Sequence, residues 1–137
     1  MSNVFTVALG GALGAVCRYL ITLLPMNPES GFPVKTFLIN VAGSFLIGIV
    51  AALAARNALN PRTVLLLKVG ICGGFTTFSS FALETEELVG KGTGTALWYV
   101  LLSLVCGVLA DRIPLRKNPE KVSPAAVVST AFTRTAS

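Results

Sequence analysis

The segment GGFTTFSSF, residues 73–81, decides the fold, because it interrupts a stretch that is otherwise apolar enough to cross a membrane. In lipid every hydroxyl needs a hydrogen-bond partner and every glycine weakens a helix. Gly73 and Gly74 permit unusual dihedral angles, and the hydroxyls of Thr76 and Thr77 can replace lost backbone hydrogen bonds. The segment therefore predicts a membrane helix that is broken near its middle.

Four long apolar stretches are spaced along the chain, at residues 4–24, 36–55, 64–83 and 95–110. The chain is 53% hydrophobic and only 12% charged, which is far from the composition of an ordinary soluble domain. The first three stretches reach roughly the 30 Å of a hydrocarbon core, whereas the fourth is short and needs its flanks, or a thinned bilayer, to cross. The predicted fold is an all-α integral membrane protein with four transmembrane helices, the third of them broken.

The net charge of +5 comes from residues in connections and in the C-terminal part, which argues against a nucleic-acid-binding face. Lys35 and Lys91 belong to one side of the predicted membrane topology. The other side collects more basic residues, namely Arg56, Arg62, Arg112, Arg116, Lys117 and Lys121. This bias predicts a multi-pass protein of the cell inner (plasma) membrane with both termini in the cytoplasm.

Two regions follow from the same pattern. Residues 1–110 form the predicted four-helix transmembrane domain. Residues 111–137 contain three prolines, scattered charges and little periodic apolar surface, so they predict a disordered cytoplasmic tail.

Cysteine and histidine usage narrows the function classes. Cys17, Cys72 and Cys106 fall one in each of three spans without C-x-x-C spacing, and the chain contains no histidine. Zinc binding and disulfides are therefore disfavoured, and the cysteines are expected to be small buried hydrophobic residues. An enzyme is disfavoured as well, because no buried acid pair or metal cluster is present to catalyse a reaction.

Two pairs of glycines have the spacing that lets membrane helices approach closely. Gly10-x-x-x-Gly14 and Gly70-x-x-x-Gly74 each place two glycines on one helical face. Four short spans do not easily enclose a polar pathway alone, so the two pairs together favour an oligomer.

Polar residues within the spans allow alternative interpretations. Arg18 either extends its side chain to the interface or ties the first span to carbonyl groups of a broken helix. Asn40 and Ser44 form a polar stripe that either bonds another helix or, as we favour, lines a wet path. Phe78 and Phe81 share a face, which is ordinary in helix packing. Two ring edges are also partly positive and can coordinate a small anion without trapping it.

Three motifs together closely resemble the Fluc (CrcB-type) fluoride channels: GGALGAVCRY at 10–19, TFLINVAGSFLIG at 36–48 and GICGGFTTFSSFALE at 70–84. The resemblance covers about 110 residues and all four spans, and the third motif is highly specific. It implies an antiparallel dimer of four-helix subunits with two fluoride pathways and a central structural Na⁺.

Site residues are carried over from this resemblance by position. It implies that backbone carbonyls of Gly73 and Thr76 bind Na⁺, and that Arg18 and Glu84 occupy structural or vestibule positions. The implied fluoride pathway comprises the Asn40 amide as a donor, Phe78 and Phe81 as an aromatic box, the Ser80 hydroxyl, and the polar track of Tyr99 and Ser103.

The expected function is passive export of cytoplasmic fluoride, and the expected partners are fluoride, the lipid bilayer and a second subunit. That subunit is either a second copy or, as the basic bias favours, an oppositely oriented paralogue. The alternative is a small multidrug-type proton-coupled transporter, which needs a titratable carboxylate that the interiors of the first, second and fourth spans lack. Two positions depart from the family pattern, Lys35 in place of glycine and Gly107 in place of a track hydroxyl.

Overall fold

The computed structural model describes residues 2–26, 28, 29, 31–92 and 94–115. All regular structure in this part of the chain is helical. The elements are α1 (Ser2–Thr22), α2 (Val34–Ala55), α3 (Pro61–Val64), the π-helix η1 (Leu65–Cys72), α4 (Gly73–Phe75), α5 (Phe78–Gly90) and α6 (Thr95–Leu115). Four segments are long and apolar enough to cross a membrane: Ser2–Thr22, Val34–Ala55, Pro61–Gly90 and Thr95–Leu115. The prediction of a four-span, all-helical membrane protein is confirmed.

The fourth span is longer than the sequence pattern indicated. Helix α6 continues past residue 110 to Leu115 and includes Pro114 near its end, so it has 21 residues and needs no thinned bilayer. The apolar run stops at Asp111 and Arg112, but charged residues at a helix end lie at the membrane interface without ending the helix. The predicted disordered tail of residues 111–137 therefore begins too early, because residues 111–115 are helical, and its remainder lies outside the described residues.

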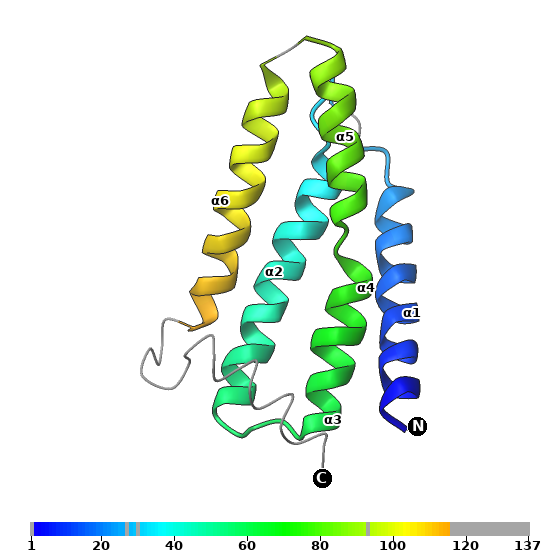
Figure 1. Ribbon diagram of the computed structural model, residues 1–137, viewed down its shortest axis with the longest axis vertical. Coiled ribbons are helices and arrows are strands. Elements are labelled where there is room, and N and C mark those ends of the chain that lie inside the picture. Colours follow the sequence, from blue (N-terminus) through cyan, green and yellow to red (C-terminus); the bar gives the residue numbers. More distant parts are fainter. Residues whose placement is uncertain (1, 27, 30, 93, 116–137) are drawn as a thin grey trace.

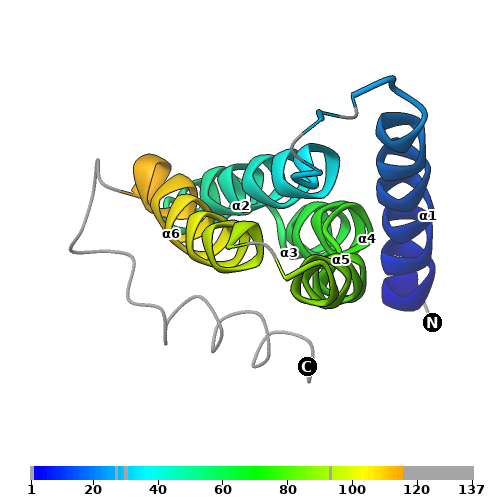
Figure 2. The same ribbon diagram turned by 90° about the horizontal axis from the view of Figure 1, so that it is seen from above.

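The spans lie side by side as long rods (Figure 1). The start of α1 and the α2–α3 connection lie at one end of the bundle, here called the Pro61 end, and α6 ends short of it (Figure 1). The connections after α1 and after α5 lie at the opposite end, here called the Gly90 end. Seen from above, α1 lies on one side of the third span, and α2 and α6 lie on the other (Figure 2).

The two glycine pairs pack against each other within the chain. A Cβ added at Gly10 would lie 2.9 Å from Gly70 Cα, and one added at Gly74 would lie 3.0 Å from Gly11 Cα. A Cβ at Gly14 would lie 2.8 Å from Phe75 N, so α1 contacts η1 and α4 backbone to backbone. The inference that these glycines favour an oligomer is therefore wrong. Glycine spacing indicates that helices approach closely, but it does not say whether they belong to one chain or two.

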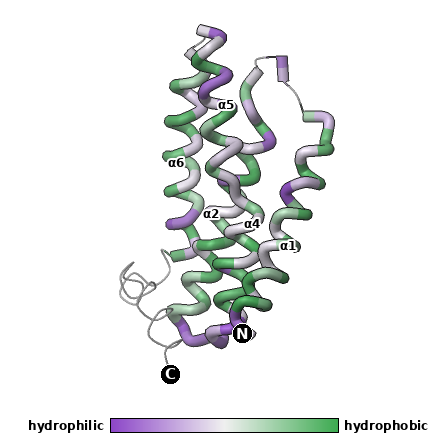
Figure 3. The backbone as a smooth tube through the Cα atoms, turned by 45° about the vertical axis from the view of Figure 1, so that its right-hand side comes forward, coloured by the Kyte–Doolittle hydropathy of each residue, from purple (hydrophilic) through white to green (hydrophobic). Residues whose placement is uncertain are grey.

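The surface of the described chain is that of a membrane protein. Hydrophilic residues gather mostly at the two ends of the bundle, and the middle of the helices is mostly hydrophobic (Figure 3). Large apolar side chains such as Phe5, Leu9, Leu101 and Val108 are exposed in the single chain. In a bilayer such side chains contact lipid tails or other membrane helices.

Candidate functional site

Two extended residues separate α4 from α5 within the third span. Thr76 has φ −73° and ψ 156°, and Thr77 has φ −147° and ψ 112°. The N–H and the hydroxyl of Thr76 both donate to the Cys72 carbonyl at 3.0 Å, which closes the last turn before the extended residues. Thr77 then caps α5, because its Oγ1 accepts the Ser80 N–H at 3.2 Å. We call Thr76 and Thr77 the interruption.

Asn40 of α2 holds the interruption through two hydrogen bonds. Its Nδ2 donates to the Thr77 carbonyl at 3.1 Å, and its Oδ1 accepts the Thr77 N–H at 2.9 Å. Only this amide orientation satisfies both Thr77 groups. The side chain thus replaces hydrogen bonds that a continuous helix would make, and one Nδ2 hydrogen remains for another acceptor.

The interruption also releases carbonyl groups of α4. The Thr77 N–H would close a helical turn onto the Gly73 carbonyl, but it donates to Asn40 instead. The Gly74 carbonyl accepts a hydrogen bond of 3.2 Å from Arg18 Nε on α1. This contact corresponds to the second interpretation of Arg18, in which it ties the first span to the third.

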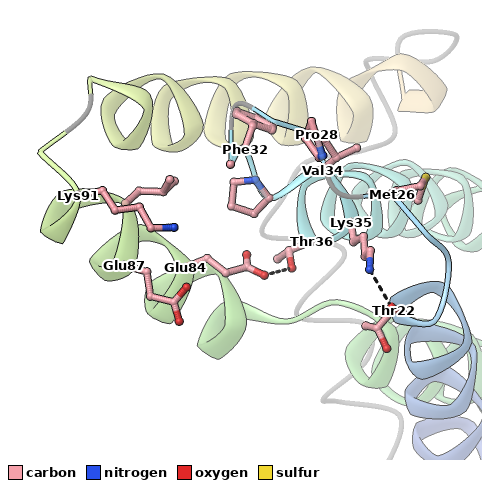
Figure 4. A pocket seen from close by; sticks show the side chains of 13 residues that line it. Thr22, Met26, Pro28, Phe32, Val34, Lys35, Thr36, Glu84, Glu87 and Lys91 are labelled. Carbon is pink, nitrogen blue, oxygen red and sulfur yellow. Dashed lines mark hydrogen bonds between the residues drawn. The ribbon is translucent and has the colours of Figure 1, made fainter.

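Glu84 joins three helices toward the Gly90 end. Its Oε1 accepts a hydrogen bond of 2.6 Å from Thr36 Oγ1 on α2, and its Oε2 accepts one of 2.8 Å from the Tyr99 hydroxyl on α6. Figure 4 shows the bond between Glu84 and Thr36. Because both carboxylate oxygens are bonded, Glu84 fixes α5 against α2 and α6.

A cavity of about 350 Å³ opens beside Glu84 at the Gly90 end. Its lining includes Lys35, Glu87 and Lys91, so charges of both signs face it (Figure 4). Lys35 Nζ donates to the carbonyl of Thr22, the last residue of α1, at 2.9 Å. A cation is favourable at a helix C-terminus, so Lys35, which stands where the family pattern has glycine, caps α1.

Aromatic rings connect the interruption to α6. The ring centroids of Phe78 and Phe81 are 5.9 Å apart with planes inclined by 40°, and those of Phe81 and Tyr99 are 5.1 Å apart. Tyr99 is fully buried, whereas Phe78 is 79% exposed. The chain alone therefore covers one side of this ring cluster and leaves the other side open.

Ser103 and Gly107 continue along α6 from Tyr99. The Ser103 Oγ is buried and has no hydrogen-bond partner among the described residues. A Cβ added at Gly107 would lie 3.5 Å from Ser44 Oγ on α2. Gly107 therefore faces Ser44 of α2, with ordinary van der Waals space for a Cβ between them.

The structure brings most of the predicted site residues into two groups. The first group surrounds the interruption and consists of Asn40, Gly73, Thr76 and Arg18. The second group lies between α5 and α6 and consists of Phe81, Tyr99 and Glu84, with the exposed Phe78 beside it. Ser80 lies at the start of α5, where its Oγ accepts a hydrogen bond of 3.0 Å from the Thr77 hydroxyl.

Sequence reasoning missed two residues that the structure makes prominent, and it expected of Thr77 only a hydroxyl role, whereas Asn40 bonds the Thr77 backbone. Thr36 bonds directly to Glu84, and nothing in its spacing distinguished it from other threonines. Lys68 is half-buried in η1. Its charge inside an apolar stretch was a signal that could have identified it.

Four membrane-crossing helices with polar groups gathered at middle depth define a small multi-pass membrane protein with a polar centre. The chain belongs to the CrcB family, since the family model described as "CrcB-like protein, Camphor Resistance (CrcB)" matches residues 5–112.

Three similar proteins are each described as "Fluoride-specific ion channel FluC". The protein of Chlorobaculum tepidum is 46% identical over 110 residues, which are 79% of this chain and 87% of the relative. That of Novosphingobium aromaticivorans is 48% identical over 107 residues, 74% of this chain and 84% of the relative. That of Thermus thermophilus is 46% identical over 110 residues, 79% of this chain and 88% of the relative.

Proposed function

We propose that this chain is the subunit of a fluoride-selective channel that lets cytoplasmic fluoride leave passively. Family membership and the description of the relatives give the class of function. The observation that carries the proposal is the interruption itself, where the Asn40 amide bonds Thr77 and the Phe78 and Phe81 rings follow in the first turn of α5. Fluoride that entered as HF and dissociated inside would move down its gradient through this region.

Selectivity follows from coordination by uncharged groups. The remaining Nδ2 hydrogen of Asn40 donates to the anion, and the edges of Phe78 and Phe81 present their positive rims. A fixed charge in contact with fluoride would hold it too tightly to conduct, so weak multi-site contacts suit rapid passage. A narrow site of this kind favours small fluoride over larger chloride.

The hydroxyl groups of Tyr99, Ser103 and Ser80 extend the path as a chain of exchangeable donors. Tyr99 donates to Glu84 in this structure, so it serves fluoride only by exchanging that bond for one to the anion. Ser103 has its donor free among the described residues. The track therefore offers successive hydroxyl donors, of which Tyr99 is held by the Glu84 carboxylate.

A structural Na⁺ fits the carbonyl groups at the interruption. The Gly73 carbonyl is released from its helix by the Asn40–Thr77 contact, and extended backbone at Thr76 turns another carbonyl out of the helix. Hard cations prefer such oxygen ligands, and unwound membrane helices provide them. Two carbonyls do not complete a coordination shell, but two symmetry-related subunits would supply four. When bound, Na⁺ would supply a fixed positive charge that holds the two interruptions together.

A second subunit would also complete the ring cluster. Phe78 is 79% exposed although it adjoins the most polar part of the span, so we infer that an antiparallel partner covers it. In such a dimer each of the two pores would take rings from both subunits. The partner is either a second copy or an oppositely oriented paralogue.

The direct test of the function is fluoride efflux from liposomes that contain this chain, together with the oppositely oriented paralogue where the labelling experiment below shows a fixed orientation. We expect fluoride to leave when the membrane potential is released by an ionophore, and chloride-loaded vesicles to retain their chloride. Efflux of both anions would contradict the proposed selectivity, and efflux of neither would contradict the channel.

We predict that the chain inserts in one orientation, with the Pro61 end in the cytoplasm. Arg56 caps α2 and Arg62 is in α3 at that end, and Arg112 is in the last turn of α6 on the same side, against Lys35 and Lys91 at the Gly90 end. Such a bias fixes orientation. The measurement is labelling by an impermeant thiol reagent of single cysteines at exposed Ala58 or Gly90, with the native cysteines replaced. Only the Gly90 probe should react from outside in cells that express the chain alone.

The labelling result decides the partner. A chain of fixed orientation cannot form an antiparallel dimer with itself, so it needs an oppositely oriented paralogue. Comparable labelling of both probes would instead show dual topology, and the dimer would then consist of two copies of this chain.

A further inference from the structure

Lys68 places a charge well inside the third membrane-crossing segment. It lies in η1, seven residues from Pro61, which corresponds to about 10 Å below that end of the span at about 1.5 Å per residue. Charged side chains inside spans are rare and usually face a bundle interior or a water-filled cavity. The π-helical backbone is a second unusual feature here, because π-helical turns are often found at functional sites.

The side of the helix that carries Lys68 faces away from α1. Leu66 O and Gly70 Cα are the atoms nearest to a Cβ added at Gly10 of α1. Lys68 is two positions from each of them, and residues two apart lie on nearly opposite sides of a helix. Figure 2 shows α2 and α6 on that side of the third span.

The same face leads directly to the interruption. The π-helical turn of η1 places Lys68 about one turn before Cys72 and Gly73, Thr76 bonds the Cys72 carbonyl one turn further on, and a Cβ added at Gly43 of α2 would meet Thr76 Cγ2. Lys68 therefore lies about two helical turns from the interruption, on the Pro61 side of it.

No acidic residue compensates Lys68 within the described chain. The elements that pack against η1 are α1, α2, α3 and α4, and none of them contains Asp or Glu. The Lys68 side chain makes no hydrogen bond or ion pair with a described residue. Most of the described acids are at the Gly90 end, and Asp111, on α6 beside Gly48 of α2, forms no ion pair with Lys68. An ammonium group in this position needs water or an anion beside it.

We propose that Lys68 lines the fluoride path between the Pro61 end and the interruption and attracts the anion toward the coordinating rings. This inference rests on the proposed function. A fixed cation in a low-dielectric channel mouth raises the local anion concentration. Because Lys68 is separated from Asn40 and the phenylalanine rings, it raises the rate at which fluoride reaches them and does not itself coordinate the anion there.

A simpler role would be that the lysine stem extends to the interface and the ammonium lies in bulk water. In that case Lys68 would act like any surface charge at the Pro61 end. The exposed Arg62, on α3 at the same end, is a matched control for this role.

The experiment measures initial fluoride flux against fluoride concentration in proteoliposomes of the full chain, with the partner subunit where one is required. We expect Lys68→Gln to lower flux about threefold to tenfold at low fluoride and much less near saturation. Lys68→Arg should preserve the flux, Lys68→Glu should lower it below the Gln variant, and Arg62→Gln should match the parent.

The outcomes separate this inference from the proposed function. Flux in Lys68→Gln equal to the parent, or an equal loss in Arg62→Gln, overturns the role of Lys68 and leaves the channel intact. Loss of dimer assembly in Lys68→Gln, seen by cross-linking, also overturns it, because Lys68 would then be an inter-subunit residue. If the parent itself passes no fluoride, the proposed function fails, and this inference fails with it.

Discussion

Replacing Phe78 and Phe81 together by isoleucine is expected to abolish fluoride passage and leave an assembled dimer. Isoleucine retains a bulky apolar side chain but lacks the partly positive ring edge that would face the anion. The two rings are adjacent, at 5.9 Å between centroids, so a single substitution would leave one ring able to contact fluoride. Fluoride-electrode recordings from proteoliposomes measure the flux, and size-exclusion chromatography with cross-linking measures assembly.

The matched control is the double replacement of Phe5 and Phe45 by isoleucine. Both are exposed phenylalanines on other helices, at 72% and 39% exposure, and neither adjoins the interruption. The control should conduct like the parent. Undiminished flux in the Phe78/Phe81 variant would remove the rings from the coordination site and leave them as packing residues.

Asn40→Asp is expected to lower fluoride flux by about a hundredfold or more, although the two side chains have nearly the same size. A carboxylate repels an anion at 4 Å by about 4 kcal/mol at an effective dielectric constant of about 20. It also loses the Nδ2 donor that bonds the Thr77 carbonyl at 3.1 Å, so two oxygen atoms would face each other. Flux and assembly are measured as for the phenylalanine pair.

Asn40→Ala separates repulsion from loss of the Thr77 contact. The alanine variant lacks both hydrogen bonds to Thr77 but adds no charge, so it should conduct less than the parent and more than Asn40→Asp. Equal flux in the parent and the Asp variant, with assembly intact, would mean that Asn40 only joins α2 to the third span.

The number and type of membrane helices could be predicted because they depend on runs of apolar residues. The end of α6 could not, since helical hydrogen bonding continues through Asp111 and Arg112 after the apolar run has stopped. The role of the glycine pairs was also beyond sequence reasoning. Gly10 meets Gly70 only because α1 packs on the third span, and spacing contains no information about which helices become neighbours.

The candidate site was predictable as a set of residues and less so as a set of contacts. Asn40 was identified as a polar side chain in lipid, but its two bonds to Thr77 depend on the extended backbone at that residue. Glu84 was noted without a partner, and the structure bonds it to Thr36 and Tyr99. Pairings between helices far apart in sequence require the three-dimensional arrangement.

The close packing of α1 on the third span has a consequence for synthesis of the protein. Gly14 and the Ile71–Phe75 backbone that it contacts are separated by roughly 60 residues, which a ribosome adds in about 3–12 s at about 5–20 residues per second. During this interval α1 and α2 are in the membrane, and the glycine face of α1 has only lipid against it. Arg18 is likewise without the Gly74 carbonyl until the third span inserts. The first helix therefore completes its packing only when the third leaves the insertion machinery, and a nascent chain stalled before residue 74 would expose the glycine face to other membrane proteins.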